Sequence, residues 1–255
     1  MLFDSHAHLQ SDAIEDKLEH ILQRAREAEV EDIAVVGYDL PSSRQAVELA
    51  RRHKMLHAVV GIHPHDAKTA DEETLAEIMR LGKLPEVVAI GEMGLDYFRN
   101  LSPKDEQINA FRAQIKIAHE LGKPIVIHDR DAHQEVLDIL KSEKAGRNMG
   151  IMHCYSGHLP LAVELMKQGF YISIAGPVTY KNAAKTQEVA AKVPADRLLV
   201  ETDCPYLSPE PFRGKTNEPA RVRDTARKVA ELRHKPLEEI SYLTWLNARK
   251  VFGLG

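Results

Sequence analysis

Short apolar runs alternate with segments of helical periodicity along nearly the whole chain, and this alternation limits the possible folds more than any other feature. Each run has the length and apolar content of a strand buried on both faces, as in parallel sheets. The predicted strands cover 2–9, 33–37, 57–63, 87–92, 125–128, 150–153, 170–174 and 198–203. The predicted helices cover 12–28, 41–52, 72–81, 104–121, 131–144, 159–168, 182–192 and most of the chain from 219 onward. The pattern predicts an α/β protein with a parallel sheet covered by helices.

The number of strand–helix units separates two α/β architectures. Eight units in a chain of 255 residues are typical of a TIM-type (β/α)8 barrel, and we predict one single-domain barrel over residues 1–255. An open doubly wound sheet is the alternative, but Gly37 is not followed by the glycines of a dinucleotide-binding turn. Residues 214–216 resemble the end of a phosphate-binding loop, yet Pro209 stands where that loop needs its first glycine. Neither nucleotide-binding motif is complete.

Composition and charge limit the cellular location and the binding partners that we expect. The sequence has no apolar run long enough to span a membrane, no N-terminal leader and only two cysteines, so we expect a cytoplasmic protein without a membrane partner. The formal net charge of -4 excludes a protein that binds nucleic acid through a uniformly basic surface. A polyanionic substrate must then be met by a local patch or by metal ions. No segment indicates an obligate protein partner.

Residues that suit metal coordination stand at the ends of several predicted strands. They are His6, His8, His63, Glu92, His128, His153 and Asp203. In a parallel barrel the carboxyl ends of all strands lie on one face, and two residues two apart on a strand point the same way. Each residue alone could be an ordinary polar residue at a loop. Buried together without a cation, however, these imidazoles and carboxylates would carry a large desolvation cost.

The chemistry of this residue set predicts hydrolysis with metal ions. Four of these five histidines, with the glutamate and the aspartate, are enough ligands for two divalent cations, and a histidine-rich set favours zinc, manganese, iron or nickel over magnesium. Glu92 can bridge two cations, and Asp203 can bind metal and also orient or deprotonate the attacking water. The ligand set does not determine which bond is cleaved.

Seven segments of the chain resemble the TatD family of metal-dependent deoxyribonucleases. These segments are Phe3–His8, Gly61–His65, Ala89–Tyr97, Pro124–His128, His153–Gly157, Glu201–Leu207 and Arg213–Pro219. They occur in the family's order and spacing, so the resemblance covers nearly the whole chain. It implies an amidohydrolase-like barrel with a pair of divalent ions, for which zinc, manganese and magnesium are the candidates.

Carried over by position, the resemblance implies a distribution of ligands. His6, His8, Glu92 and Asp203 would surround one ion, and Glu92, His128 and His153 would surround the other. Many relatives in the wider superfamily bridge their metals with a carbamylated lysine. Glu92 occupies the corresponding position here, so no carbamate is needed.

Other residues are candidates for contact with the substrate. His63 is expected either to contact a phosphate or to hydrogen-bond a metal ligand. Tyr97 and Arg99, after the fourth strand, and Arg213 with Lys215, after the eighth, could form a cationic and stacking surface for a nucleic acid strand. The alternative for these loop residues is that they are simply solvated.

The predicted function is a metal-dependent deoxyribonuclease that cleaves phosphodiester bonds of DNA, with exonuclease action expected and with Asp203 and Glu92 as catalytic residues. One rival is a small-molecule amidohydrolase, lactonase or phosphoesterase on the same scaffold. A second rival is a degenerate barrel that serves as a binding module, but the complete ligand set argues against it.

Overall fold

The computed structural model describes residues 1–12, 14 and 18–255, and its strands form one parallel sheet in the order of the chain. The strands are β1 (Leu2–Ala7), β2 (Val30–Val36), β3 (Leu56–Val60), β4 (Val87–Asp96), β5 (Ile125–Arg130), β6 (Gly150–Met152), β7 (Phe170–Ile174) and β8 (Leu198–Val200). Eight strands in this order, each followed by helix, are the topology of a (β/α)8 barrel. The predicted fold class is confirmed.

Helices connect consecutive strands, and two more follow the last strand. They are α1 (Leu18–Glu27), α2 (Leu40–Arg52), α3 (Glu72–Gly82), α4 (Lys104–Leu121), α5 (His133–Ser142), α6 (Leu159–Lys167), α7 (Ala184–Lys192), α8 (Val222–Arg233) and α9 (Leu237–Phe252). The early part of the helix predicted over 12–28 includes residues 13 and 15–17, which lie outside the described residues. Within the described part of the chain, no helix is both long and apolar enough to cross a membrane.

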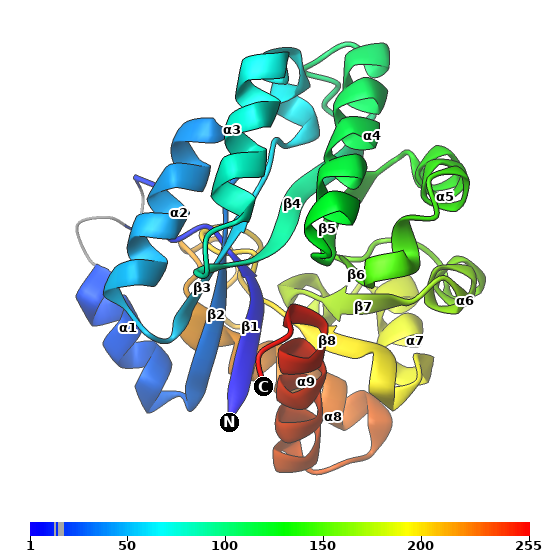
Figure 1. Cartoon of the computed structure of the whole chain (residues 1–255). Coiled ribbons are helices and arrows are strands. Elements are labelled where there is room, and N and C mark those ends of the chain that lie inside the picture. Colours follow the sequence, from blue (N-terminus) through cyan, green and yellow to red (C-terminus); the bar gives the residue numbers. More distant parts are fainter. Residues whose placement is uncertain (13, 15–17) are drawn as a thin grey trace. The chain divides into compact units, whose positions relative to one another are not determined.

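The chain divides into two compact units, of which the first comprises residues 1–35, 154–164 and 172–255. Figure 1 shows α8 and α9 side by side, with α9 against β1. The rings of Phe3 and Phe252 stack at a centroid distance of 5.4 Å, which fixes the end of α9 on β1. The indole N–H of Trp245 donates to the Asp32 carboxylate at 2.9 Å. The C-terminal helices therefore form part of the apolar layer behind β1.

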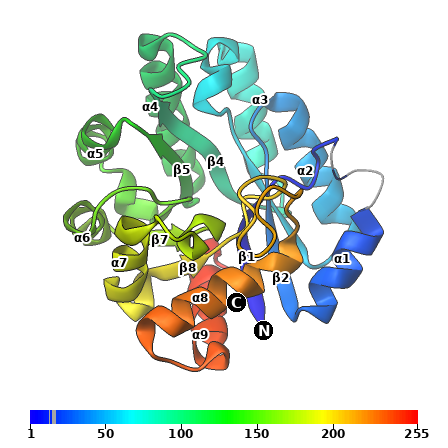
Figure 2. The same ribbon diagram turned by 180° about the vertical axis from the view of Figure 1, so that it is seen from behind.

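The second unit comprises residues 36–153 and 165–171. Asp39 caps α2, since its carboxylate accepts from the backbone N–H of Ser42 at 2.7 Å and the Ser42 hydroxyl accepts from the backbone N–H of Asp39 at 3.0 Å. The helix α4 ends at Gly122, which adopts the left-handed conformation, and the sequence predicts this end. Figure 2 shows β4 and β5 side by side, and their register aligns Gly94 with His128.

Several predicted strands differ in extent from the observed ones, and the third and the eighth each end three residues early. The third was predicted to reach His63, but β3 ends at Val60 and His63 caps a short 3-10 helix, η2 (Pro64–Thr69). Pro64 lacks the N–H that a continuing strand would need. The eighth strand was predicted to reach Asp203, but β8 ends at Val200. The reason is that the backbone N–H of Thr202 donates to the buried Asp4 carboxylate and not to the backbone of a neighbouring strand.

Replacing Gly94 with alanine is expected to destabilise the protein by about 3 kcal/mol or more. Gly94 has a φ of +141°, and an added Cβ would overlap the backbone carbonyl of His128. Gly122→Ala is the matched control, because Gly122 also has positive φ but has no atom within 4 Å of the added Cβ. Urea unfolding of both variants measures the difference. Equal midpoints would show that the close approach at Gly94 carries no cost.

Candidate metal centre

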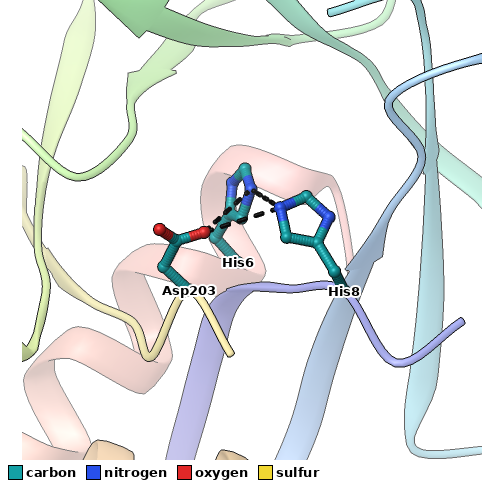
Figure 3. Close-up of side chains that lie close together, drawn as sticks. All are labelled: His6, His8 and Asp203. Atoms are coloured by element: carbon teal, nitrogen blue, oxygen red, sulfur yellow. Dashed lines mark hydrogen bonds and ion pairs between the residues drawn. The ribbon is translucent and has the colours of Figure 1, made fainter. Parts of the chain in front are cut away.

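The first candidate cluster consists of His6, His8 and Asp203, all in the first unit. Figure 3 shows the three side chains pointing toward one another from β1 and from the segment after β8. The two Nε2 atoms lie 3.3 Å apart. The Oδ1 atom of Asp203 lies 3.9 Å from Nε2 of His6 and 3.5 Å from Nε2 of His8. The predicted convergence of these two histidines on one point is confirmed, although His8 lies one residue beyond the end of β1.

Backbone hydrogen bonds to β1 position Asp203 in this cluster. Its N–H donates to the carbonyl of His6 at 2.9 Å, and its φ of +55° turns the chain out of the strand direction. The preceding residue, Thr202, donates its N–H and its hydroxyl to the two carboxylate oxygens of the buried Asp4, at 2.8 and 2.5 Å. Burial raises the pKa of Asp4 to about 8, and the hydrogen bonds from Thr202 oppose that rise.

The second candidate cluster surrounds Glu92 in the second unit. Its Oε1 atom lies 2.9 Å from Nδ1 of His128, 2.9 Å from Nε2 of His153 and 3.5 Å from Nε2 of His63. Glu92 is almost fully buried, with 2% of its surface exposed. Three imidazole nitrogens thus meet one buried carboxylate oxygen.

Asp96 extends the second cluster by a further carboxylate. Its Oδ2 atom lies 2.8 Å from Nε2 of His65 and 3.1 Å from Nε2 of His128. Burial raises the pKa of Asp96, but hydrogen bonds from His128, from the backbone N–H of Arg99 and from His65 outweigh burial and hold it well below its usual range. Burial lowers the pKa of His128, yet its bonds to Asp96 and Glu92 raise it overall.

Sequence reasoning assigned no role to Asp96. The signal was present, because Asp96 stands four residues after Glu92, and an even spacing on a strand places two side chains on one face. The strand was predicted to end at Glu92, whereas β4 continues to Asp96. That early end concealed the relation between the two carboxylates.

The donor atoms of both clusters fit divalent cations. A neutral imidazole carries one proton and so has one nitrogen with a free lone pair. In the first cluster Nε2 of His6 and Nε2 of His8 face each other and Asp203. In the second Nδ1 of His128 and Nε2 of His153 face Glu92, so the nitrogens of both clusters are placed to bind a cation. The ligand atoms of His6, His8 and Asp203 lie within 4.8 Å of one another, and so do those of His63, Glu92 and His128. Imidazole nitrogens and carboxylate oxygens are ligands that proteins use for divalent cations.

Comparison with known proteins gives the family. The model of the family described as "TatD related DNase" matches residues 3–253. The chain belongs to the TatD family. A metal-dependent hydrolase of Bacillus subtilis named YabD, described as uncharacterized, is 49% identical over 252 residues, which cover 99% of each chain. The predicted enzyme class, a metal-dependent hydrolase, is thereby confirmed.

Two further relatives link the TatD family to a described activity and to a solved structure. The TatD protein of Erwinia tasmaniensis, named a 3'-5' ssDNA/RNA exonuclease, is 36% identical over 99% of this chain and 100% of its own. The crystal structure of the TatD homologue YjjV from Escherichia coli K12 matches with a TM-score of 0.94 and 29% identity, over 100% of this chain and 98% of that one.

The residues of this TatD chain predicted to contact substrate differ in their surroundings. Tyr97 is half-buried; its hydroxyl donates to Glu135 at 2.6 Å, and the Nζ atom of Lys104 lies 3.9 Å from its ring centroid. Arg99 is exposed. Arg213, in the first unit, is also exposed, and its guanidinium lies 4.4 Å from the ring of Tyr180.

Proposed function

We propose that the chain is a metal-dependent nuclease that hydrolyses phosphodiester bonds of single-stranded DNA, starting from an end. The observation that carries this proposal is the convergence of imidazoles on Glu92 and on Asp203 in a chain of the TatD family. The exonuclease named among the relatives aligns along its full length, which supports the choice of substrate. Cytoplasmic location and the lack of an obligate protein partner stay predictions from the sequence.

The proposal includes two divalent ions. We propose that His6, His8 and Asp203 hold one ion, and that Glu92, His128 and His153 hold the other, with zinc, manganese and magnesium as candidates. The resemblance to the family also places Glu92 at the first ion, and this shared ligand stays a prediction. Bound ions would supply positive charge for the phosphoryl oxygens and would make a water molecule more acidic.

The side chains themselves orient the reactants and move the proton. The Asp203 carboxylate accepts the proton of the attacking water. Its Oδ1 atom faces Nε2 of His6 and Nε2 of His8, which places the carboxylate beside the proposed ion. The Nδ1 atom of His63 accepts the backbone N–H of His65 at 3.0 Å, so a neutral His63 carries its proton on Nε2. An Nε2–H group does not ligate a metal, but it can donate to a phosphate oxygen or to Oε1 of Glu92, which lies 3.5 Å away, so it is consistent with both roles predicted for His63.

Cleavage of end-labelled single-stranded DNA by metal-loaded protein, with and without chelator, tests the function. We expect chelator-sensitive products that form a ladder from one end. With about three phosphate contacts, kcat/KM should fall roughly 20-fold when the salt concentration rises about fourfold. Hydrolysis of small neutral esters or amides with no cleavage of DNA would instead support the small-molecule hydrolase, whose rate has no such salt dependence. RNA of the same length in a parallel arm shows whether the sugar is discriminated.

Replacing Asp96 with asparagine is expected to lower the affinity of the protein for divalent metal about 10- to 100-fold, the usual effect of losing a carboxylate behind a metal-binding histidine. The Asp96 carboxylate accepts from Nε2–H of His128 and so keeps the proton on that nitrogen, which leaves the lone pair of Nδ1, on the side of Glu92, for an incoming ion. Equilibrium dialysis against zinc alone measures the affinity. Unchanged affinity in a folded variant would remove Asp96 from the metal centre.

A further inference from the structure

An aromatic ring stands exposed just beyond the end of β4. Phe98 has 62% of its surface exposed, and the guanidinium of Arg130, at the end of β5, lies 4.1 Å from its ring centroid. A cation that close to the ring face holds the ring in place and adds a second flat surface to it. We propose that Phe98 and Arg130 form a subsite on which a base of a single-stranded nucleic acid stacks. This inference rests on the proposed nuclease function.

The register of the sheet places this pair next to the second candidate cluster. Gly94 pairs with His128, and Asp96 pairs with Arg130 two residues further along the strands. Two residues of strand advance by about 6.6 Å, and successive bases in a stacked strand are about 3.4 Å apart. A strand with a phosphate at the Glu92 and His128 cluster would therefore bring a base one or two nucleotides away to Phe98.

Hydrogen bonds hold the loop that carries Phe98 in a fixed conformation. The N–H of Tyr97 donates to the carbonyl of Arg130 at 2.9 Å, and the N–H of Arg99 donates to the Asp96 carboxylate at 2.7 Å. A ring positioned in advance loses little conformational entropy when a base stacks on it. The subsite is thus built before the substrate arrives.

Phe98 is better suited to stacking than its neighbour Tyr97. Tyr97 is half-buried and its hydroxyl is bound to Glu135, whereas Phe98 has 62% of its surface exposed. Arg130, Lys104 and the exposed Arg99 place three cationic groups at or beside residues 97 and 98, against the carboxylate of Glu135 at the Tyr97 hydroxyl, and cationic groups attract a phosphate backbone. Charge and shape together favour a nucleic acid strand as the occupant of the subsite.

Binding of base-containing and abasic strands by the metal-loaded protein tests the subsite. The probes are fluorescein-labelled oligothymidylate and an abasic strand of equal length, both with phosphorothioate linkages that slow cleavage, and the readout is fluorescence anisotropy. We expect the wild type to bind oligothymidylate roughly 5- to 100-fold more tightly than the abasic strand, the range found for base–aromatic stacking.

Variants assign that preference to Phe98. Phe98→Ala should bind both strands equally, Phe98→Trp should keep the preference, and Tyr242→Ala, which removes an exposed aromatic ring on α9, should behave as the wild type. The proposal is overturned if the wild type binds both strands equally or binds neither, or if Phe98→Ala keeps the full preference with an unchanged melting temperature. A base preference without any DNA cleavage would support the subsite and overturn the proposed function alone.

Discussion

Asp203→Asn is expected to lower the rate of DNA hydrolysis at least about 100-fold, the scale of a lost acid–base group, while the protein keeps its fold. Asparagine has the same shape but cannot accept a proton from water at neutral pH, and it carries no charge for a cation. The backbone should tolerate the change, because asparagine adopts positive φ as readily as aspartate does and the N–H of residue 203 still reaches His6.

Single-turnover cleavage of end-labelled single-stranded DNA measures this rate, and circular dichroism reports the fold. Asp196→Asn is a matched control, since the Asp196 side chain is 71% exposed and lies in neither cluster. The control should cleave at the wild-type rate. Full activity in Asp203→Asn would exclude Asp203 from the reaction.

Glu92→Gln is expected to reduce the affinity for divalent metal at least about 100-fold. Loss of a residue that only hydrogen-bonds to a ligand costs about 10- to 100-fold, and loss of a direct ligand should cost more. Activity should fall to the level of chelator-treated wild type. The Glu92 carboxylate lies within 2.9 Å of ring nitrogens from both His128 and His153. A neutral amide in its place removes the negative charge that a cation among these nitrogens needs, and its N–H₂ group would face them.

Metal content after dialysis against a fixed concentration of zinc or manganese, together with the cleavage rate, tests the second cluster. Glu48→Gln serves as the control, because Glu48 lies on the exposed side of α2, where its side chain is 64% accessible. If Glu92→Gln retained both metal and activity, the cluster around Glu92 would not be the metal centre. If it retained metal but lost activity, Glu92 would act in catalysis rather than in ion binding.

The sequence was enough to establish the architecture and most of the candidate ligands. Apolar periodicity is a local property, so α4 was predicted at its observed bounds, 104–121, and the strand at 170–174 likewise. The pairing of His6 and His8 followed from the alternation of side chains on a strand, which needs no knowledge of distant residues. The single-domain organisation and a shared ligand between the two proposed ions stay predictions.

Tertiary structure decided what lies just beyond the strand ends. Asp203 reaches His8 because its N–H donates to the carbonyl of His6, and because Asp4, almost 200 residues earlier, takes up the hydrogen bonds of Thr202 and ends β8 early. Asp96 joins His128 because β4 runs four residues past its predicted end in register with β5. These positions depend on hydrogen bonds between segments far apart in the chain, and a local pattern of apolar and polar residues carries no information about such partners.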